Sequence, residues 1–164
     1  MNKIVVFILF MFGCISCGEK KVEEVKEDNS MALVDLKKLP KKVTPTEDAI
    51  LILKDWTEYN ALNSAISAIY TVETKEDLVV FVEDVIEKQK LLEKSVYPIA
   101  FNRPDIKSRQ KVFKTYVLKI KSNIVFDINP RDAVIEMVKA YNAFNNQFSV
   151  VVRSTLDPKV LFDE

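Results

Sequence analysis

Residues 129–151 read NPRDAVIEMVKAYNAFNNQFSVV, and this stretch decides the fold of the chain. Asparagine followed by proline is typical of a helix start, because the first helical turn accepts proline. Large side chains then recur at alternating spacings of three and four, which places them on one face of a helix. They are Val134, Met137, Tyr141, Phe144, Phe148 and Val151. The stretch therefore predicts a long helix with one buried seam.

Three earlier stretches carry comparable start signals. TPTE at 44–47 and TKED at 74–77 each place a threonine cap before an acidic residue, and NRPD at 102–105 again places proline just inside a start. Valine runs such as LVVFV at 78–82 resemble strands, but the caps and the long seams favour helices. The three predicted seams are Ile52, Trp56, Tyr59, Asn63, Ile66 and Tyr70; Leu78, Val82, Val85, Gln89, Leu92 and Val96; and Ile106, Gln110, Phe113, Val117, Ile120 and Ile124.

The four predicted helices have short connections, which favour antiparallel neighbours. We therefore expect an all-α fold, an up-down-up-down four-helix bundle formed by residues 45–154. The tail, residues 155–164, carries Val160, Leu161 and Phe162 and is expected to fold back over one end of the bundle.

The N-terminus has the pattern of an export signal. Lys3 precedes an apolar run from Ile4 to Ile15, which is shorter than the roughly 20 residues that a membrane-spanning helix needs. The run ends in two pairs of a small residue and a cysteine, Gly13-Cys14 and Ser16-Cys17. The charged sequence GEKK follows Cys17 directly.

This ending resembles the lipobox of bacterial lipoproteins. The resemblance implies that residues 1–16 are a signal peptide and that Cys17 carries fatty acyl chains such as palmitate, which would hold the protein on a membrane. Cleavage before Cys14 is the alternative lipoprotein reading, although it would leave apolar Ile15 in the mature chain. A signal without lipid is the third reading.

Residues 17–44 alternate charges and hold few large apolar residues, which predicts a lipidated N-terminus on a flexible tether. Within it, MALVDLKKLP at 31–40 could dock on the body as a short turn. A serine-cysteine ending with a charged spacer resembles lipoproteins of the Bacteroidota. The expected location is the cell membrane or the outer membrane, with the body facing the periplasm or the cell surface.

Composition argues against most enzyme classes and cofactors. The chain has no histidine, two glycines and two cysteines, and both glycines and both cysteines lie within residues 13–18. These counts exclude histidine-based triads, the usual zinc ligand sets and glycine-rich phosphate loops in the predicted helices. The formal net charge is zero, which argues against a nucleic acid partner. We expect no enzyme, no cofactor and no metal.

Two matching pentads form the first candidate site. YNALN at 59–63 and YNAFN at 141–145 each fall near the middle of a predicted helix. In the predicted bundle these two helices are neighbours, so the pentads should lie at one level. They could form a polar pocket for a small neutral ligand, or a hydrogen-bonded layer that fixes helix register, as buried polar groups do in coiled coils. The residues concerned are Tyr59, Asn63, Tyr141 and Asn145.

A lysine-rich stretch in the third predicted helix forms the second candidate site. It could present a basic face to anionic headgroups or to an acidic partner, or it could be a solvated face paired with acidic residues of the second helix. Its residues are Lys107, Lys111, Lys114 and Lys121.

Together these features predict a membrane-anchored lipoprotein of the bacterial envelope, a non-enzymatic helical interaction or scaffold module with an envelope protein as its partner. The alternative is a small-molecule carrier or sensor that uses a polar pocket inside the bundle.

Overall fold

The computed structural model describes residues 36 and 38–156 of the 164-residue chain. The predicted signal peptide, Cys14, Cys17, most of the predicted tether and residues 157–164 lie outside the described residues. Helices make up 77% of the described part, which contains no strands. The prediction of an all-helical fold is confirmed.

The described residues form five α-helices, so the predicted number of four is wrong. Two short 3-10 helices, η3 (Ala68–Thr71) and η4 (Ile99–Phe101), precede α4 and α5. No helix in the described ranges combines the length and the apolar character needed to cross a membrane. The five α-helices are α2 (Glu47–Leu53), α3 (Thr57–Ser67), α4 (Lys75–Lys94), α5 (Pro104–Val125) and α6 (Arg131–Leu156).

The first predicted helix is broken at Trp56, and this break accounts for the fifth helix. The Trp56 backbone leaves the helical region, and its indole is 3% exposed. The indole Nε1 donates to Ser95 Oγ at 2.9 Å, and the ring packs 4.7 Å from the Tyr97 ring, measured between centroids. The amide of Asn60 donates to the Leu53 carbonyl at 3.2 Å, at the end of α2. The helix is thus interrupted at Trp56, where the indole is buried and hydrogen-bonded.

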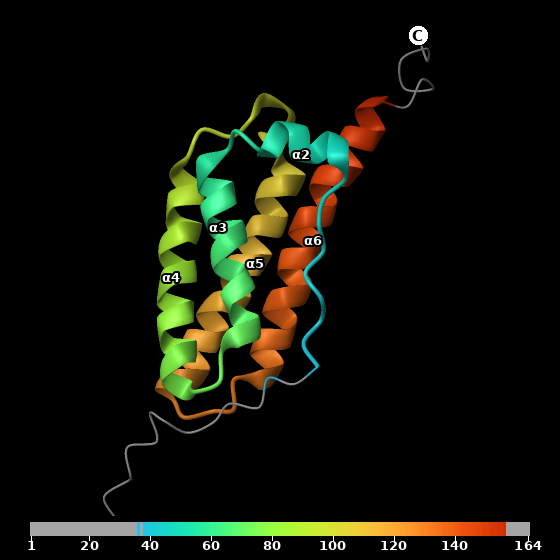
Figure 1. Ribbon diagram of the computed structural model, residues 1–164. Coiled ribbons are helices and arrows are strands. Elements are labelled where there is room, and N and C mark those ends of the chain that lie inside the picture. Colours follow the sequence, from blue (N-terminus) through green and yellow to red (C-terminus); the bar gives the residue numbers. More distant parts are fainter. Residues whose placement is uncertain (1–35, 37, 157–164) are drawn as a thin grey trace, which may run out of the picture.

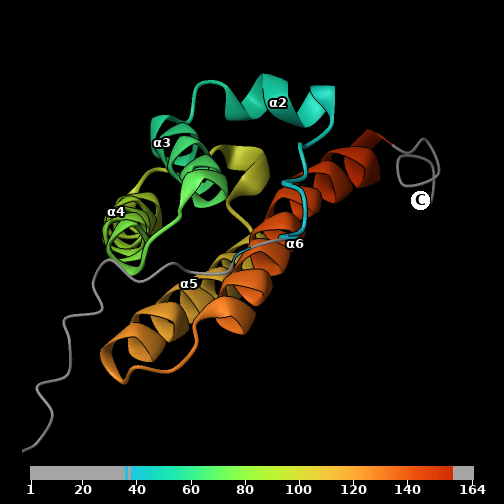
Figure 2. The same cartoon turned by 60° about the horizontal axis from the view of Figure 1, so that its bottom comes forward.

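The four longer helices lie side by side, with α2 across one end (Figure 1). Close packing joins α3 to α4, α4 to α5 and α5 to α6, while α2 contacts α6. A view turned by 60° shows the α3–α4 pair apart from the α5–α6 pair (Figure 2). The backbones of α3 and α6 are not among the closely approaching pairs, and these two helices meet through long side chains such as Tyr59 and Phe148.

Two of the predicted start signals have the expected cap geometry. Thr74 and Asp77 form a complete capping box, in which the Thr74 hydroxyl accepts from the Asp77 N–H at 3.0 Å and the Asp77 carboxylate accepts from the Thr74 N–H at 3.0 Å. At the start of α6, the Asn129 side chain accepts from the Arg131 N–H at 2.9 Å. Proline at the first position of α5 is also as predicted, although Arg103 rather than Asn102 is the cap residue.

The predicted cap at Thr44 is wrong. Helix α2 begins at Glu47 after Thr46, whose side chain makes no capping bond. Instead, the Thr46 N–H donates to Ser149 Oγ of α6 at 2.9 Å. The helix starts later because the preceding chain is attached to α6.

The predicted seams of α4, α5 and α6 agree with the buried residues except where a helix ends early, whereas the first predicted seam agrees only in part, since Leu53 and Leu62 are buried there instead of Ile52 and Asn63. All six seam residues of α6 are buried, as are the first five of α4 and of α5. Val96 is 92% exposed because α4 ends at Lys94, so its placement in a seam was wrong. Tyr70 is 43% exposed because α3 gives way to η3. In the first predicted seam, Ile52 and Asn63 are half-buried.

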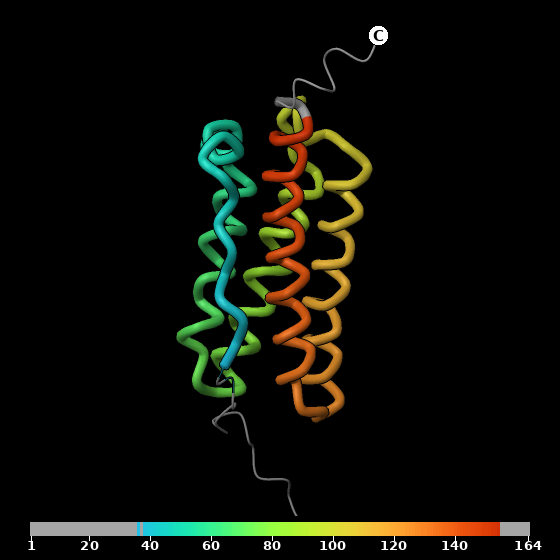
Figure 3. Tube along the Cα trace, turned by 90° about the vertical axis from the view of Figure 1, so that its right-hand side faces the viewer, coloured from blue at the N-terminus to red at the C-terminus, as the bar shows by residue number. Residues whose placement is uncertain are grey.

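Residues 38–46, which we call the strap, run as an extended segment alongside α3 and α6 (Figure 3). Leu39 packs against the core, and the Pro40 carbonyl accepts from the Tyr70 hydroxyl at 2.6 Å. Most of this segment belongs to the predicted flexible tether, within which residues 31–40 were expected to dock at most as a short turn. The structure instead places it in the space between α3 and α6.

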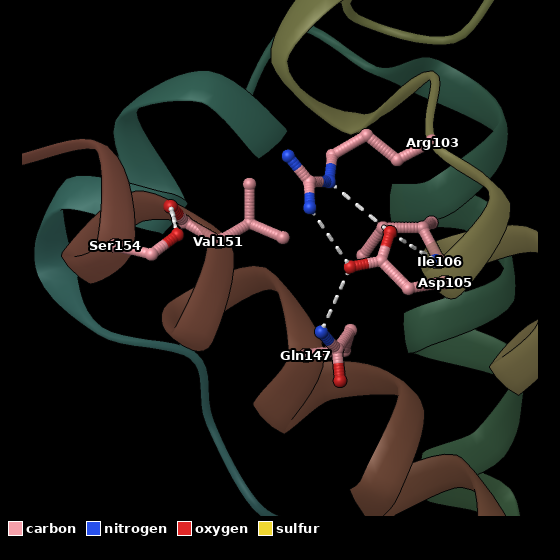
Figure 4. Close-up of polar contacts among 6 residues, drawn as sticks. All are labelled: Arg103, Asp105, Ile106, Gln147, Val151 and Ser154. Carbon is pink, nitrogen blue, oxygen red and sulfur yellow. Dashed lines mark hydrogen bonds and ion pairs between the residues drawn. The ribbon is translucent and has the colours of Figure 1, made fainter. Parts of the chain in front are cut away.

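A polar cluster ties the start of α5 to α6 (Figure 4). The Asp105 carboxylate accepts from Arg103 Nε at 3.1 Å and from Gln147 Nε2 of α6 at 3.2 Å. The hydrogen bond from Arg103 is the main reason why the pKa of Asp105 is lowered. Farther along α6, the Ser154 hydroxyl donates to the Val151 carbonyl at 2.8 Å. The Gln147–Asp105 bond thus joins the start of α5 to α6.

Candidate functional site

The structure brings the two pentads together through a reciprocal pair of hydrogen bonds. The Tyr59 hydroxyl of α3 donates to Asn145 Oδ1 of α6 at 3.1 Å. The Tyr141 hydroxyl of α6 donates to Asn63 Oδ1 of α3 at 2.9 Å. Each tyrosine therefore binds the last asparagine of the opposite pentad, as expected for two antiparallel helices at one level.

Both tyrosines are buried among aromatic rings. Tyr59 is 3% exposed and Tyr141 is fully buried. The Tyr59 ring packs edge-on against Phe148 at 5.4 Å, and the Tyr141 ring packs edge-on against Phe113 at 5.4 Å. Burial raises the pKa of Tyr59 to about 12 and raises that of Tyr141 as well, because a buried phenolate is poorly solvated. Both side chains are thus neutral hydrogen-bond donors near neutral pH.

Further asparagine groups of the second pentad bind backbone. Asn142 receives the Val43 N–H on its Oδ1 and donates its Nδ2 to the Lys41 carbonyl, both at 2.8 Å. The Asn145 Nδ2 donates to the Val43 carbonyl at 2.8 Å. These bonds attach the strap to α6 and extend the polar layer from the helices to the N-terminal segment.

The geometry favours a structural layer over the predicted internal ligand pocket. Both tyrosine hydroxyls have partners, and both Oδ1 atoms that receive them are occupied. A hollow of about 410 Å³ does touch Tyr59 and Asn63, but it lies between the strap, α2 and α3, and Lys42 and Pro45 also line it. The polar groups of the layer face one another, so they hold α3 and α6 in register.

The predicted basic face divides into two parts. Lys114 Nζ lies 2.6 Å from a carboxylate oxygen of Glu93, and Lys121 Nζ lies 2.8 Å from one of Glu83, both on α4. These exposed pairs match the paired-face reading and stabilise the protein only weakly. Lys107 instead lies over the Tyr97 ring, 5.1 Å from its centroid.

Sequence reasoning missed a pocket between the end of α4, the 95–102 connection and the start of α5. It has a volume of about 390 Å³. The available signal was the presence of two polar residues, Gln89 and Gln110, in otherwise apolar predicted seams. Its lining includes Gln89, Glu93, Tyr97, Lys107, Gln110 and Lys111.

Within the described ranges, no group of three or more histidine, cysteine, aspartate or glutamate side chains is placed to hold a metal ion. Comparison with known proteins adds no further assignment: no protein-family model, no curated protein and no solved structure matches this chain. Inferences about function therefore depend on the sequence and on the geometry above.

Proposed function

We propose that the protein is a membrane-anchored lipoprotein of the bacterial envelope and that its helical body is a non-enzymatic module that binds an envelope protein. The ending Ser16-Cys17 supports lipid attachment at Cys17. The filled tyrosine–asparagine layer supports a body that acts through its surface rather than through an internal reaction. In this proposal α3, α4, α5 and α6 act as one up-down-up-down bundle.

The observation that carries the surface role is the turn between α5 and α6. Val125, Phe126 and Ile128 are 68%, 71% and 56% exposed, so three large apolar side chains occupy four residues of one turn. Grouped exposed apolar residues are typical of contact sites, whereas single ones are common on any surface. We call these three residues the apolar turn.

Its neighbours hold the apolar turn in a defined shape. Asp127 adopts a positive φ of 53°, in the left-handed region that aspartate tolerates better than most residues. The Asp127 carboxylate lies 2.8 Å from Lys75 Nζ at the start of α4. A turn fixed in this way presents Phe126 to a partner at a low entropic cost of binding.

The test is chemical cross-linking and capture of the full lipidated chain from native membranes, followed by mass spectrometry. The comparison variants are Cys17→Ser, Phe126→Asp and the control Val80→Asp, which alters a side chain of α4 that is 65% exposed. We expect a partner that is captured by the parent and by Val80→Asp but lost with Phe126→Asp. We also expect Cys17→Ser to leave the membrane fraction.

Two results would contradict the proposal. Capture of the same partner by Phe126→Asp would show that the apolar turn is not the contact. Retention of Cys17→Ser in the membrane fraction, or a mature N-terminus at Cys14, would overturn lipid attachment at Cys17.

A further inference from the structure

The pocket beside Gln110 has an unusual pair of buried polar side chains in its lining, Gln89 and Gln110. Gln89 and Gln110 are 2% and 3% exposed, so both side chains are almost entirely withdrawn from solvent. Within the described residues, neither Gln89 Oε1 nor Gln110 Nε2 has a hydrogen-bond partner. Buried polar atoms in folded proteins are nearly always paired, so two unpaired atoms in one pocket call for a ligand or solvent.

The orientation of Gln110 is set by its neighbour. The Tyr97 hydroxyl donates to Gln110 Oε1, which turns the amide nitrogen away from that contact. The nitrogen offers N–H donors, while Gln89 Oε1 offers an acceptor. A ligand that satisfies both atoms presents an acceptor to one and a donor to the other, as an amide group does with its C=O and N–H.

Charge at the rim favours an anionic group on the same ligand. Lys107 and Lys111 line the pocket, together with one carboxylate, that of Glu93. Lys114 lies 2.6 Å from the Glu93 carboxylate and offsets its charge. The rim is thus positive on balance, and a carboxylate a few atoms from the amide would meet the two lysines.

We propose that this pocket binds a small ligand that carries an amide group and a nearby carboxylate, the chemistry of an acylated amino acid or an acylated dipeptide. The pocket volume of about 390 Å³ suits a molecule of that size. This site lies apart from the apolar turn and goes beyond the proposed function, so either proposal can fail without the other.

The test is an NMR titration of the full isotope-labelled chain with N-acetyl-alanyl-alanine, up to about 10 mM. The side-chain amide signals of Gln89 and Gln110 are the readout. We expect saturable shifts of both signals. We expect the C-terminal amide form of the same dipeptide to bind about tenfold more weakly, because it lacks the carboxylate.

Variants distinguish ligand binding by the two glutamines from a purely structural role. Gln110→Met and Lys111→Ala should each weaken binding of the acid probe by about tenfold or more. Lys119→Ala is the matched control, since Lys119 is an exposed lysine of the same helix outside the pocket, and it should bind like the parent. Lys111 is exposed, so its loss should leave the fold intact.

Three results would overturn the proposal. The first is the absence of saturable shifts with both probes, which would mean that solvent alone satisfies the two amides. The second is parent-like binding by Gln110→Met. The third is equal binding of the acid and amide probes, which would show that the pocket does not recognise a carboxylate.

Discussion

The Tyr141 hydroxyl of α6 donates to Asn63 Oδ1 of α3 at 2.9 Å, although the two residues lie 78 positions apart in the sequence. The Tyr59–Asn145 bond repeats this contact with the roles of the helices exchanged. The Tyr59 ring also packs against Phe148 of α6, and the strap bonds to Asn63 of α3 and to Asn145 of α6. The matching pentads are therefore explained by the register of two helices.

The first prediction concerns pH. The pKa of Tyr59 rises from the ordinary value of about 10 to about 12 in the folded protein. A group with a raised folded-state pKa contributes stability below its unfolded pKa and loses that contribution as pH rises through the folded value. We expect the difference in free energy of unfolding between the parent and Tyr59→Phe to narrow above pH ~10.

Urea denaturation at a series of pH values measures this difference. Tyr116→Phe, which removes a half-buried hydroxyl from α5 outside the layer, provides the control for losing a tyrosine. A parent-to-Tyr59→Phe difference that stays constant up to pH ~12 would show that burial does not hold Tyr59 in its neutral form.

The second prediction concerns the strap. Asn142→Ala removes both side-chain bonds to Lys41 and Val43, so the Val43 amide should exchange with solvent about tenfold faster or more. The helices should keep their protection, because their backbone hydrogen bonds are made within each helix. Hydrogen exchange with mass spectrometry measures both effects. Asn146→Ala is the control, since Asn146 is exposed; similar exchange in the two variants would contradict the assignment.

The third prediction compares two threonine caps. Thr74→Ala breaks a complete capping box and should lower the free energy of unfolding by about 1 kcal/mol. Thr46→Ala should change it by less than about 0.5 kcal/mol, because the Thr46 side chain makes no cap bond. Thermal and urea denaturation give both values. A larger decrease in the free energy of unfolding for Thr46→Ala than for Thr74→Ala would be inconsistent with the observed helix starts.

The fourth prediction concerns the unpaired Gln89 Oε1 in the pocket beside Gln110 and its effect on the free energy of unfolding. Gln89→Leu should raise the free energy of unfolding of the ligand-free protein by about 1 kcal/mol, because it removes a buried acceptor without a protein partner. Gln147→Leu should lower it, because the Gln147 amide donates to Asp105. Destabilisation by Gln89→Leu would indicate that the amide has a structural partner.

The parts of the fold that were predicted correctly depend on local signals. The capping box at Thr74 and the apolar spacing of α4, α5 and α6 involve residues within a few turns of one another. The alignment of the two pentads with each other was also predicted, because each lies near the middle of its helix and the two helices are antiparallel.

The parts that were missed depend on distant contacts. The helix break follows from the bond of Trp56 to Ser95, 39 residues away, and nothing in the local spacing indicates it. The strap was predictable in part: Asn142, Asn145 and Ser149 form a polar row at spacings of three and four beside the apolar seam of α6. Each of them binds the backbone of the strap, so a polar row on a helix was the overlooked signal.

The most direct test of this account is a double-mutant cycle on Tyr141 and Asn63. Tyr141→Phe, Asn63→Leu and the double variant are compared with the parent by urea denaturation. If the layer holds α3 and α6 in register, the two single changes will each destabilise the protein and show a coupling energy of about 1 kcal/mol. A coupling energy of zero, with both single variants as stable as the parent, would contradict the structural role of the layer.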